Sequence, residues 1–350
     1  FHYMKANNFS IDLRSDTVTR PSLEMREVMN NAVTGDDVFA EDPEINDLQN
    51  RCAEMFGMEA GLFCPSGTMT NQIAISVHTR PGDEVICDKL SHIYNYEGGG
   101  IARLSGASVK LLEGDRGRFT SEDVAKSINP TDSHYARTSL VSLEDTCNKG
   151  GGAIWDERVI AEISTLTRSK GLAIHLDGAR LWNSIVAKGI QNNPAALKKY
   201  GRNFDSISLC FSKGLGCPVG SVLIGSNEFI YEAHRARKVF GGGMRQAGIV
   251  AAAGVYALEN NLDRLAQDHL HAKMLGEVAL KNKYVKSVSE VETNICIVEL
   301  NPGMDSGHIA KVWGDMGILC FPFSPTSIRF VTHLDVDLEQ VELACGLLSQ

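Results

Sequence analysis

The stretch SLCFSKGLGCPVGS, residues 208–221, places one lysine between an apolar run and a turn rich in glycine and proline. A short apolar run of this kind is typical of a buried strand, because helices cover both faces of a parallel sheet. Ordinary lysines lie on polar, exposed faces. Lys213 is therefore expected where a buried strand ends, and the residues gathered around it should indicate its use.

Similar apolar runs recur along the chain and alternate with amphipathic segments. They predict strands at residues 60–64, 83–88, 108–112, 139–144, 172–177, 206–211 and 220–225. Residues 69–79 and 156–171 have the pattern of helices, and the second segment has one apolar face. This alternation predicts an α/β fold with a mostly parallel sheet that is covered on both sides.

The pattern changes beyond about residue 245. A long helical stretch is expected to about residue 280, and strand-like runs and two further helices follow it, which predicts a small α+β domain. We expect an N-terminal segment at 1–40, a large domain at 41–255 and a small C-terminal domain at 256–350. The N-terminal segment is polar and rich in aspartate, so it should pack across the body or onto a partner chain.

The composition excludes several classes of protein. The net charge of −9 and the isoelectric point of about 5.6 argue against nucleic acid or an anionic membrane as the main partner. Nine cysteines without a C-x-x-C pair predict reduced thiols in a cytoplasmic protein, and no metal site. The first ten residues lack the apolar core of a signal peptide, and no apolar run is long enough to span a bilayer.

Polar residues follow four of the predicted strands. In open α/β sheets, ligands bind beyond the carboxyl ends of the strands. The segment PSGTMTN, with Gly67 and Thr68, could bind a phosphate at a helix N-terminus, or Ser66 or Thr68 could simply cap that helix. His92 follows the next strand, where a lone histidine is usually a surface residue.

Two further strand ends carry charge. Asp177 ends the run LAIHLD with Arg180 three residues on, which could equally form a structural salt bridge or a helix cap. Lys213 follows SISLCF and could be an ordinary turn lysine. Taken together, the four strand ends fit one ligand, pyridoxal 5′-phosphate (PLP). Its aldehyde requires a lysine, its pyridine nitrogen an aspartate, its phosphate a helix N-terminus and its ring a flat neighbour.

Two nucleotide-binding motifs are absent from the sequence. No G-x-G-x-x-G follows the first strand, as a dinucleotide-binding fold would require, and the chain has no G-x-x-x-x-G-K-[ST] phosphate loop.

The chain resembles the low-specificity L-threonine aldolases, which include L-allo-threonine aldolases and belong to the aspartate-aminotransferase-like (fold type I) PLP enzymes. The resemblance runs from about Ile11 to about Leu343. It rests on the segments DLRSDTVTRPS (12–22), GDDVFAEDP (35–43), PSGTMTNQ (65–72), SHIYNYEGGG (91–100), HYARTSLVSLEDT (134–146), HLDGAR (175–180), SKGLGCPVGS (212–221), FGGGMRQAG (240–248) and RFVTHLD (329–335).

The resemblance implies roles for individual residues. Lys213 is the implied Schiff-base lysine, Asp177 the partner of the pyridine nitrogen, and His92 the residue that stacks on the ring and a candidate base. The resemblance further implies that the cofactor contacts Gly67, Thr68, Arg180 and Lys238. It implies that the substrate carboxylate is bound by Ser15, Arg180 and Arg329. His134 is implied as a second active-site histidine. Arg329 lies inside the apolar strand SIRFVTHL, where its charge needs a compensating anion. The alternative is that the strand lies at the edge of a sheet and Arg329 extends into water.

The implied reaction is the retro-aldol cleavage of an L-3-hydroxy amino acid, such as L-threonine or L-allo-threonine, to glycine and an aldehyde. It would proceed through an external aldimine with PLP and cleavage of the Cα–Cβ bond. The family also implies a homotetramer, a dimer of dimers with sites between subunits. A β-eliminating lyase of the same fold, and a silent PLP-fold binding or regulatory protein, remain as alternatives.

Two residues depart from the family pattern. Phe39 stands in a segment where relatives often carry a tyrosine, and Cys147 stands where many relatives carry a histidine. Both departures concern the preference among substrates rather than the class of reaction.

Overall fold

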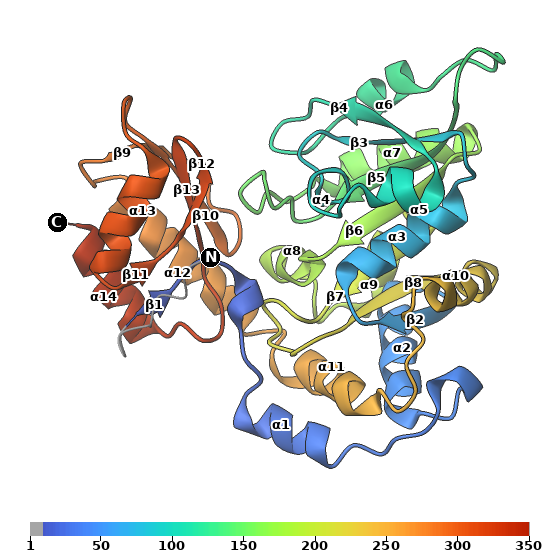
Figure 1. Ribbon diagram of the computed structural model, residues 1–350, viewed down its shortest axis with the longest axis horizontal. Helices are drawn as coiled ribbons and strands as arrows, with labels where there is room; N and C mark the ends of the chain where they lie inside the picture. Colours follow the sequence, from blue (N-terminus) through green and yellow to red (C-terminus); the bar gives the residue numbers. More distant parts are fainter. Residues whose placement is uncertain (1–9, 350) are drawn as a thin grey trace.

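The computed structural model describes residues 10–349 and consists of a large and a small body (Figure 1). The large body is built on a seven-stranded sheet and the small body on a four-stranded sheet. Residues 1–9, where the sequence predicts no signal peptide, lie outside the described residues. Within the described part of the chain, no helix is both long and apolar enough to cross a membrane.

The sheet of the large body has the strand order β2-β8-β7-β6-β5-β3-β4. Its strands are β2 (Ala60–Cys64), β3 (Asp83–Asp88), β4 (Ser108–Leu112), β5 (Arg137–Glu144), β6 (Ala173–Gly178), β7 (Ser206–Cys210) and β8 (Ser221–Gly225). Among these strands β8 alone runs antiparallel to its neighbours, and the other pairs are parallel. The predicted α/β fold with a mostly parallel sheet is confirmed.

Helices cover both faces of this sheet. One face packs against α3 (Gly67–His78), α4 (His92–Asn95), α5 (Gly100–Ser105) and α10 (Asn227–Val239). The other packs against α2 (Pro43–Phe56), α6 (Ser121–Ser127), α7 (Glu157–Ser169), α8 (Leu181–Ala187), α9 (Pro194–Gly201) and α11 (Gly248–Asn260). Alternate strand residues enter the two cores: Leu62 packs on the first side and Phe63 on the second.

The predicted bounds agree closely with these elements. Strands β2, β3 and β4 coincide with the predicted 60–64, 83–88 and 108–112. Helix α3 begins two residues earlier than predicted because the Ser66 hydroxyl accepts a hydrogen bond from the backbone N–H of Met69 and caps the helix. The long helix expected to about residue 280 is instead two helices, α11 and α12 (Leu265–Ala279).

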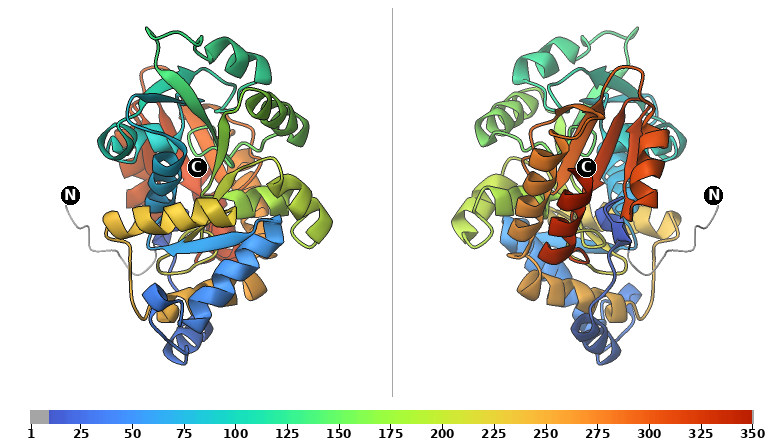
Figure 2. Two further views of the ribbon diagram at one scale, coloured as in Figure 1. Left: turned by 90° about the vertical axis from the view of Figure 1, so that its right-hand side faces the viewer. Right: turned by 90° about the vertical axis from the view of Figure 1, so that its left-hand side faces the viewer.

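The small body is an antiparallel sheet with helices on it, and it faces the viewer in the right-hand view of Figure 2. Its strand order is β12-β13-β10-β9. The elements are β9 (Val285–Val288), β10 (Ile295–Leu300), α13 (Ser306–Asp315), β11 (Ile318–Leu319), β12 (Phe321–Ser324), β13 (Ser327–Val331) and α14 (Leu338–Leu348). Strand β13 lies between β12 and β10, so the alternative of Arg329 on an edge strand is wrong.

The N-terminal segment belongs to both bodies. Strand β1 (Ile11–Asp12) pairs with β11, and Ile11 lies in the core of the small body. The chain then passes through a short helix, η1 (Asp16–Val18), and reaches α1 (Leu23–Asn30), which packs on α11 of the large body (Figure 1). A second short helix, η2 (Asp37–Phe39), precedes α2. The domain limits at residues 40 and 255 stay a prediction; α11 runs across the second of them.

Candidate active site

Lys213 lies just beyond the end of β7, at the edge of the sheet where ligands of α/β proteins bind. Its Nζ atom is 3.5 Å from Sγ of Cys210, and its backbone carbonyl accepts a hydrogen bond of 2.9 Å from the hydroxyl of Thr19. Burial raises the pKa of Cys210, but the Lys213 ammonium and hydrogen bonds from Ser212 and Ser221 together lower it more, so this pKa lies below its usual value. The lysine is thus held beside the N-terminal segment.

Asp177 lies on the neighbouring strand β6 and is buried. One carboxylate oxygen accepts from the backbone N–H of Ala179 at 3.0 Å, and the other from the side-chain amide of Asn71 at 2.9 Å. Both donors are neutral, and each oxygen keeps a lone pair for a further donor. This arrangement suits a carboxylate that receives the N–H of a pyridinium ring.

His92 begins α4, beyond the end of β3, and its side chain is about one-third exposed (34%). Its Nδ1 atom is 3.0 Å from Oε1 of Glu97, and its backbone N–H donates to Glu144 at 2.7 Å. Burial lowers the pKa of His92, but the hydrogen bond with Glu97 and the charges of Asp177, Glu97 and Glu144 raise it more, so it lies above its usual value. The exposed part of the imidazole is what a ligand could contact.

Gly67 and Thr68 form the first turn of α3, where backbone N–H groups have no partner inside the helix. The hydroxyl of Ser221 is buried and has no hydrogen-bond partner among the described residues, and it lies 3.6 Å from the position that a Cβ on Gly67 would take. An unpaired buried hydroxyl beside a helix N-terminus suits a phosphate. Lys213, Asp177, His92 and this turn therefore fit PLP.

Arg180 forms a buried ion pair with Asp16 of the N-terminal segment. Its Nε and Nη2 atoms donate to the two oxygens of Asp16 at 2.8 and 2.7 Å. Burial would raise the pKa of Asp16, but Arg180 lowers it to about 2. The ion pair of Arg180 is thus with Asp16 and not with Asp177, three residues before it, and Asp16 neutralises this guanidinium.

Arg329 has no such neutralising partner. Its Nη1 donates to the side-chain oxygen of Asn148 at 2.8 Å and its Nη2 to the carbonyl of Arg14 at 3.1 Å, while its Nε is buried without a partner among the described residues. The rings of Phe321 and Phe323 lie 5.3 and 5.2 Å from the guanidinium. Burial and then the charge of Arg180 lower the pKa of Arg329 to about 10. Among the described residues, no carboxylate is hydrogen bonded to the guanidinium of Arg329.

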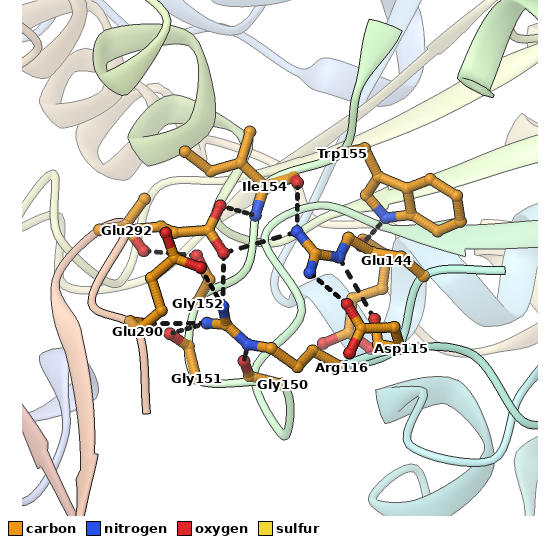
Figure 3. A network of polar contacts seen from close by, with 12 residues as sticks. Asp115, Arg116, Glu144, Gly150, Gly151, Gly152, Ile154, Trp155, Glu290 and Glu292 are labelled. Carbon is orange, nitrogen blue, oxygen red and sulfur yellow. Dashed lines mark hydrogen bonds and ion pairs between the residues drawn. The ribbon is translucent and has the colours of Figure 1, made fainter. Parts of the chain in front are cut away.

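Asn148 connects the two arginines, because the same oxygen lies 3.5 Å from Nη1 of Arg180. Its loop is anchored by the polar network in Figure 3. There Arg116 of the large body donates to Gly150 at 2.8 Å and pairs with Glu292 of the small body at 2.7 Å, and Glu292 also accepts from the backbone of Ile154. The network fixes the loop that carries Asn148 against both bodies.

Comparison with known proteins shows the family. A model of the family described as beta-eliminating lyase matches residues 12–302. The low-specificity L-threonine aldolase of Escherichia coli K12 is 42% identical over 332 residues, which cover 95% of this chain and 96% of that protein. The chain belongs to the low-specificity L-threonine aldolase family. The resemblance predicted from the sequence motifs is confirmed.

Solved structures show the same fold as this threonine aldolase family member. A threonine aldolase from Leishmania major superposes with a TM-score of 0.81 at 19% identity, covering 96% of this chain and 98% of that one. A structure of SPT with PLP gives a TM-score of 0.74 at 17% identity, covering 99% and 90%. The expected fold type I architecture is confirmed.

Two residues that the threonine aldolase resemblance implies, His134 and Lys238, lie apart from the cluster around Lys213, whereas Ser15 directly precedes Asp16 of the site. His134 is highly exposed, and its ring pairs with Asp132 at 2.7 Å. Lys238 is exposed at the end of α10, beside a surface cavity of about 770 Å³ whose lining does not include Lys213. The Ser15 hydroxyl caps η1 by accepting from the N–H of Thr17, directly before Asp16. Their roles stay predictions.

The two departures from the threonine aldolase pattern occupy different environments. Phe39 is exposed on η2, whereas Cys147 is buried beside the site. A Cβ on Gly117 would lie 2.2 Å from the sulfur of Cys147, and Gly117 has a φ of +87°. A histidine at 147 would not fit here unless the loop around Gly117 moved.

Sequence reasoning missed five residues of the site. They are Asp16, Asn71, Glu97, Glu144 and Asn148. Four of them stand inside motifs that carried the family resemblance, such as PSGTMTNQ and SHIYNYEGGG, so their position was visible but their function was not. A buried carboxylate or amide needs a partner, and here the partners come from distant segments.

Proposed function

We propose that the protein is a PLP-dependent aldolase that cleaves L-threonine and L-allo-threonine to glycine and acetaldehyde. The observation that carries the proposal is the guanidinium of Arg329, which pairs with no carboxylate of the described residues and which Asn148 links to Arg180 and, through Glu144, to His92. The relatives named low-specificity L-threonine aldolase support the substrate.

Arg329 supplies the binding site for the substrate α-carboxylate. A buried guanidinium without an anion is costly, and a carboxylate that accepts two N–H bonds is the partner that matches its geometry. Arg180 is already paired with Asp16, so its proposed contribution is to the electrostatic potential around the substrate carboxylate. Ser15, next to Asp16, adds a hydroxyl that can donate to the same group.

The cofactor would be held by residues on four strand ends. Lys213 would bind it covalently, Asp177 would receive its ring N–H, His92 would stack on it, and Gly67 and Thr68 would bind its phosphate; Lys238 is proposed to lie near it. When bound, PLP supplies an electron sink for the electron pair of the broken Cα–Cβ bond.

His92 is the proposed base. Its Nδ1 is engaged by Glu97, so in the neutral ring Nε2 carries the lone pair that can accept the β-hydroxyl proton. As the hydroxyl oxygen becomes the carbonyl oxygen of the aldehyde, that proton moves to Nε2. The α-carbon would then take up a proton in place of the lost aldehyde, and Lys213 would regain its covalent bond to the cofactor as glycine leaves. His134 is the second candidate base, and it would have to act across a subunit boundary.

A β-eliminating lyase would use the same lysine, aspartate and phosphate-binding turn, and the name of the matching family model includes this activity. The 42% identity to a protein named threonine aldolase favours the aldolase. A silent binding protein is disfavoured because Lys213 and Asp177 are both present.

We also propose a cytoplasmic homotetramer, a dimer of dimers with sites between subunits. The nine cysteines are all free in the described part of the chain, which suits a reducing compartment. Large apolar side chains are exposed on the N-terminal segment, at the end of α10 and on α11, as expected of a subunit interface; they include Leu23, Val33, Phe39, Val239 and Ile249.

Cleavage of L-threonine and L-allo-threonine, measured side by side with detection of glycine and acetaldehyde, tests the proposal. Aldolase activity gives the two products in equal amounts, whereas elimination of water gives ammonia and a 2-oxo acid. The Lys213→Ala variant should lose the visible absorption band of the Schiff base and slow turnover by roughly 10³-fold or more. Wild-type turnover in this variant would rule out the assignment.

A further inference from the structure

Glu97 is a buried carboxylate without a role in the proposed reaction. It lies between α4 and α5, and its side chain has no exposed surface. Three side chains converge on it: Nδ1 of His92 at 3.0 Å, the amide of Asn71 at 2.9 Å and the amide of Gln72 at 2.6 Å. Gly100 allows the close approach, because a Cβ there would lie 2.5 Å from the side chain of Gln72.

Glu97 and Asp177 are linked through one amide. The Nδ2 atom of Asn71 donates to Oε1 of Glu97 and to Oδ2 of Asp177, both at 2.9 Å. A ring nitrogen of His92 and one oxygen of each carboxylate lie within 4.8 Å of one another. The carboxylate expected to face the pyridine nitrogen and the carboxylate beside His92 therefore form one unit.

The orientation of Asn71 is set by His175, which lies on β6 two residues before Asp177. Its Oδ1 lies 3.1 Å from Nε2 of His175, whose Nδ1 lies 2.8 Å from the hydroxyl of Ser206. Burial lowers the pKa of His175 to about 3, so the ring is neutral at pH 7 and carries a single proton. Since Oδ1 can only accept, that proton lies on Nε2, and the amide of Asn71 must point toward the two carboxylates.

One further link completes this chain of hydrogen bonds. The Ser206 hydroxyl donates to His175, so it accepts from Nε2 of His78 at 2.8 Å. Burial lowers the pKa of His78 to about 4, which leaves that ring neutral as well. Every donor in the chain therefore points toward Asp177 and Glu97, which are both acceptors.

We propose that Glu97 is a positioning residue for His92: it accepts the Nδ1 proton, fixes the ring plane and leaves Nε2 free to accept the substrate proton. The inference rests on the proposed function, in which His92 is the base. A carboxylate on one imidazole nitrogen both orients the ring and strengthens the other nitrogen as a base. No hydrogen bond in the described part of the chain occupies Nε2 of His92.

The other groups that face His92 belong to several elements. They are Glu144 of β5, Asp177 of β6, Tyr96 with its ring 5.5 Å away at the end of α4, and Lys149, whose ammonium lies 5.6 Å from the ring of Tyr96. Glu97 is the carboxylate among them that is hydrogen bonded to the imidazole, so removing its charge should act on His92 most directly.

The test compares Glu97→Gln and Glu97→Asp with wild type, and Glu122→Gln, an exposed glutamate of α6, serves as the matched control. The first measurement is the pH dependence of kcat/KM for L-threonine. The second is the pH dependence of diethyl pyrocarbonate modification of His92 in the full-length protein with and without PLP, followed by peptide mass spectrometry, because only the neutral imidazole reacts.

In Glu97→Gln we expect the His92 modification midpoint and the acidic limb of kcat/KM to move about one pH unit or more to lower pH. We also expect kcat to fall about 10-fold or more, because the ring is no longer held. Glu97→Asp keeps the charge, so its midpoint should stay near wild type while kcat falls. Glu122→Gln should change neither.

The proposal is overturned if Glu97→Gln keeps both the wild-type midpoint and the wild-type acidic limb. If Glu97→Gln does not fold, a wild-type kcat in Glu97→Asp overturns it instead. Failure of wild type to cleave L-threonine would contradict the proposed function, and the modification midpoint of His92 would still decide whether Glu97 controls this histidine.

Discussion

Asp16 holds Arg180 through two parallel hydrogen bonds of 2.8 and 2.7 Å, and neither side chain is appreciably exposed. The two residues are separated by 164 positions, and they join the N-terminal segment to the end of β6. A buried pair of this kind costs much to break, because the remaining charge keeps its desolvation penalty. The pair therefore determines how the N-terminal segment contributes to the site.

Replacing Asp16 by asparagine should destabilise the protein strongly. Asp16→Asn leaves Arg180 and Arg329 adjacent without an anion, which is expected to lower the free energy of unfolding by about 3–5 kcal/mol. Urea unfolding of the PLP-free protein measures it. Asp12→Asn, which removes an ion pair with the half-exposed Arg14, is the matched control and should cost about 0–1 kcal/mol. Equal losses in the two variants would contradict the buried-pair argument.

Replacing Arg329 should weaken substrate binding without lowering the stability of the protein. Arg329→Gln removes the proposed carboxylate site, so kcat/KM for L-threonine should fall by about 2–4 kcal/mol, roughly 30- to 1000-fold. Because burial lowers the pKa of Arg329, its charge is unfavourable in the substrate-free protein, and the variant should unfold at the same or a higher urea concentration than wild type.

Steady-state kinetics and urea unfolding of the same preparation check both parts of this prediction. Arg158→Gln, at a highly exposed arginine on α7, is the control and should leave kcat/KM unchanged. A loss of stability without a loss of kcat/KM would show that Arg329 is structural.

The two histidines should differ in their contribution to catalysis. His92 lies beside Asp177 and Glu144, so His92→Asn is expected to lower kcat by about 10²–10⁴-fold, the usual contribution of a general base. His134 is exposed and pairs with Asp132, so His134→Asn should lower kcat by less than about 10-fold. Turnover of L-threonine under saturation measures both, and the reverse order would assign the base to His134.

Glu144 should make stability depend on pH. Burial and then the charge of Asp177 raise its pKa from 4.5 to about 7, so the folded protein keeps a proton that the unfolded chain releases between these values. Glu144 should therefore contribute a fall in the free energy of unfolding as pH rises from about 4.5 to 7, by on the order of 1–3 kcal/mol. The buried His78 and His175, whose pKa values are lowered, contribute in the opposite direction, so the contribution of Glu144 is the difference between wild type and Glu144→Gln at each pH.

Urea unfolding of PLP-free protein at several pH values measures the effect of Glu144. The glutamine loses one of the two backbone hydrogen bonds that the carboxylate accepts from His92 and Asn148, so the variant should be less stable than wild type, and the difference should be smaller at pH 7 than at pH 4.5. The control Glu122→Gln should retain the wild-type slope. An unchanged slope in Glu144→Gln would place the titration elsewhere.

The sequence was sufficient to predict the sheet and the residues at its strand ends. Apolar runs and glycine-rich turns located the strands, and the carboxyl ends of parallel strands necessarily meet at one edge, which brought Lys213 and Asp177 into one site. The anion expected beside Arg329 was also inferred from its position in an apolar strand. Among the described residues, Arg329 donates only to a neutral amide and a backbone carbonyl, which is why we propose that the substrate supplies the anion.

The supporting partners could not be predicted, because they depend on how distant segments meet. Asn71 and Asp177 are 106 residues apart, and Asn71 and Glu97 are 26 apart on a helix and a loop. No periodicity or spacing links such pairs. His134 shows the converse: its motif implied a place in the site, whereas its position in the single chain is on the surface.

The segment between Leu13 and Met25 works as a tether of fixed length. Leu13 is buried in the core of the small body and Met25 in the core of the large body, so both ends are anchored. Asp16 and the Thr19 bond to Lys213 lie on the span between them. Inserting or deleting one residue in this span would therefore shift Asp16 out of alignment with Arg180 while every side chain of the site kept its identity. The length of the tether is thus as much a determinant of the site as its residues.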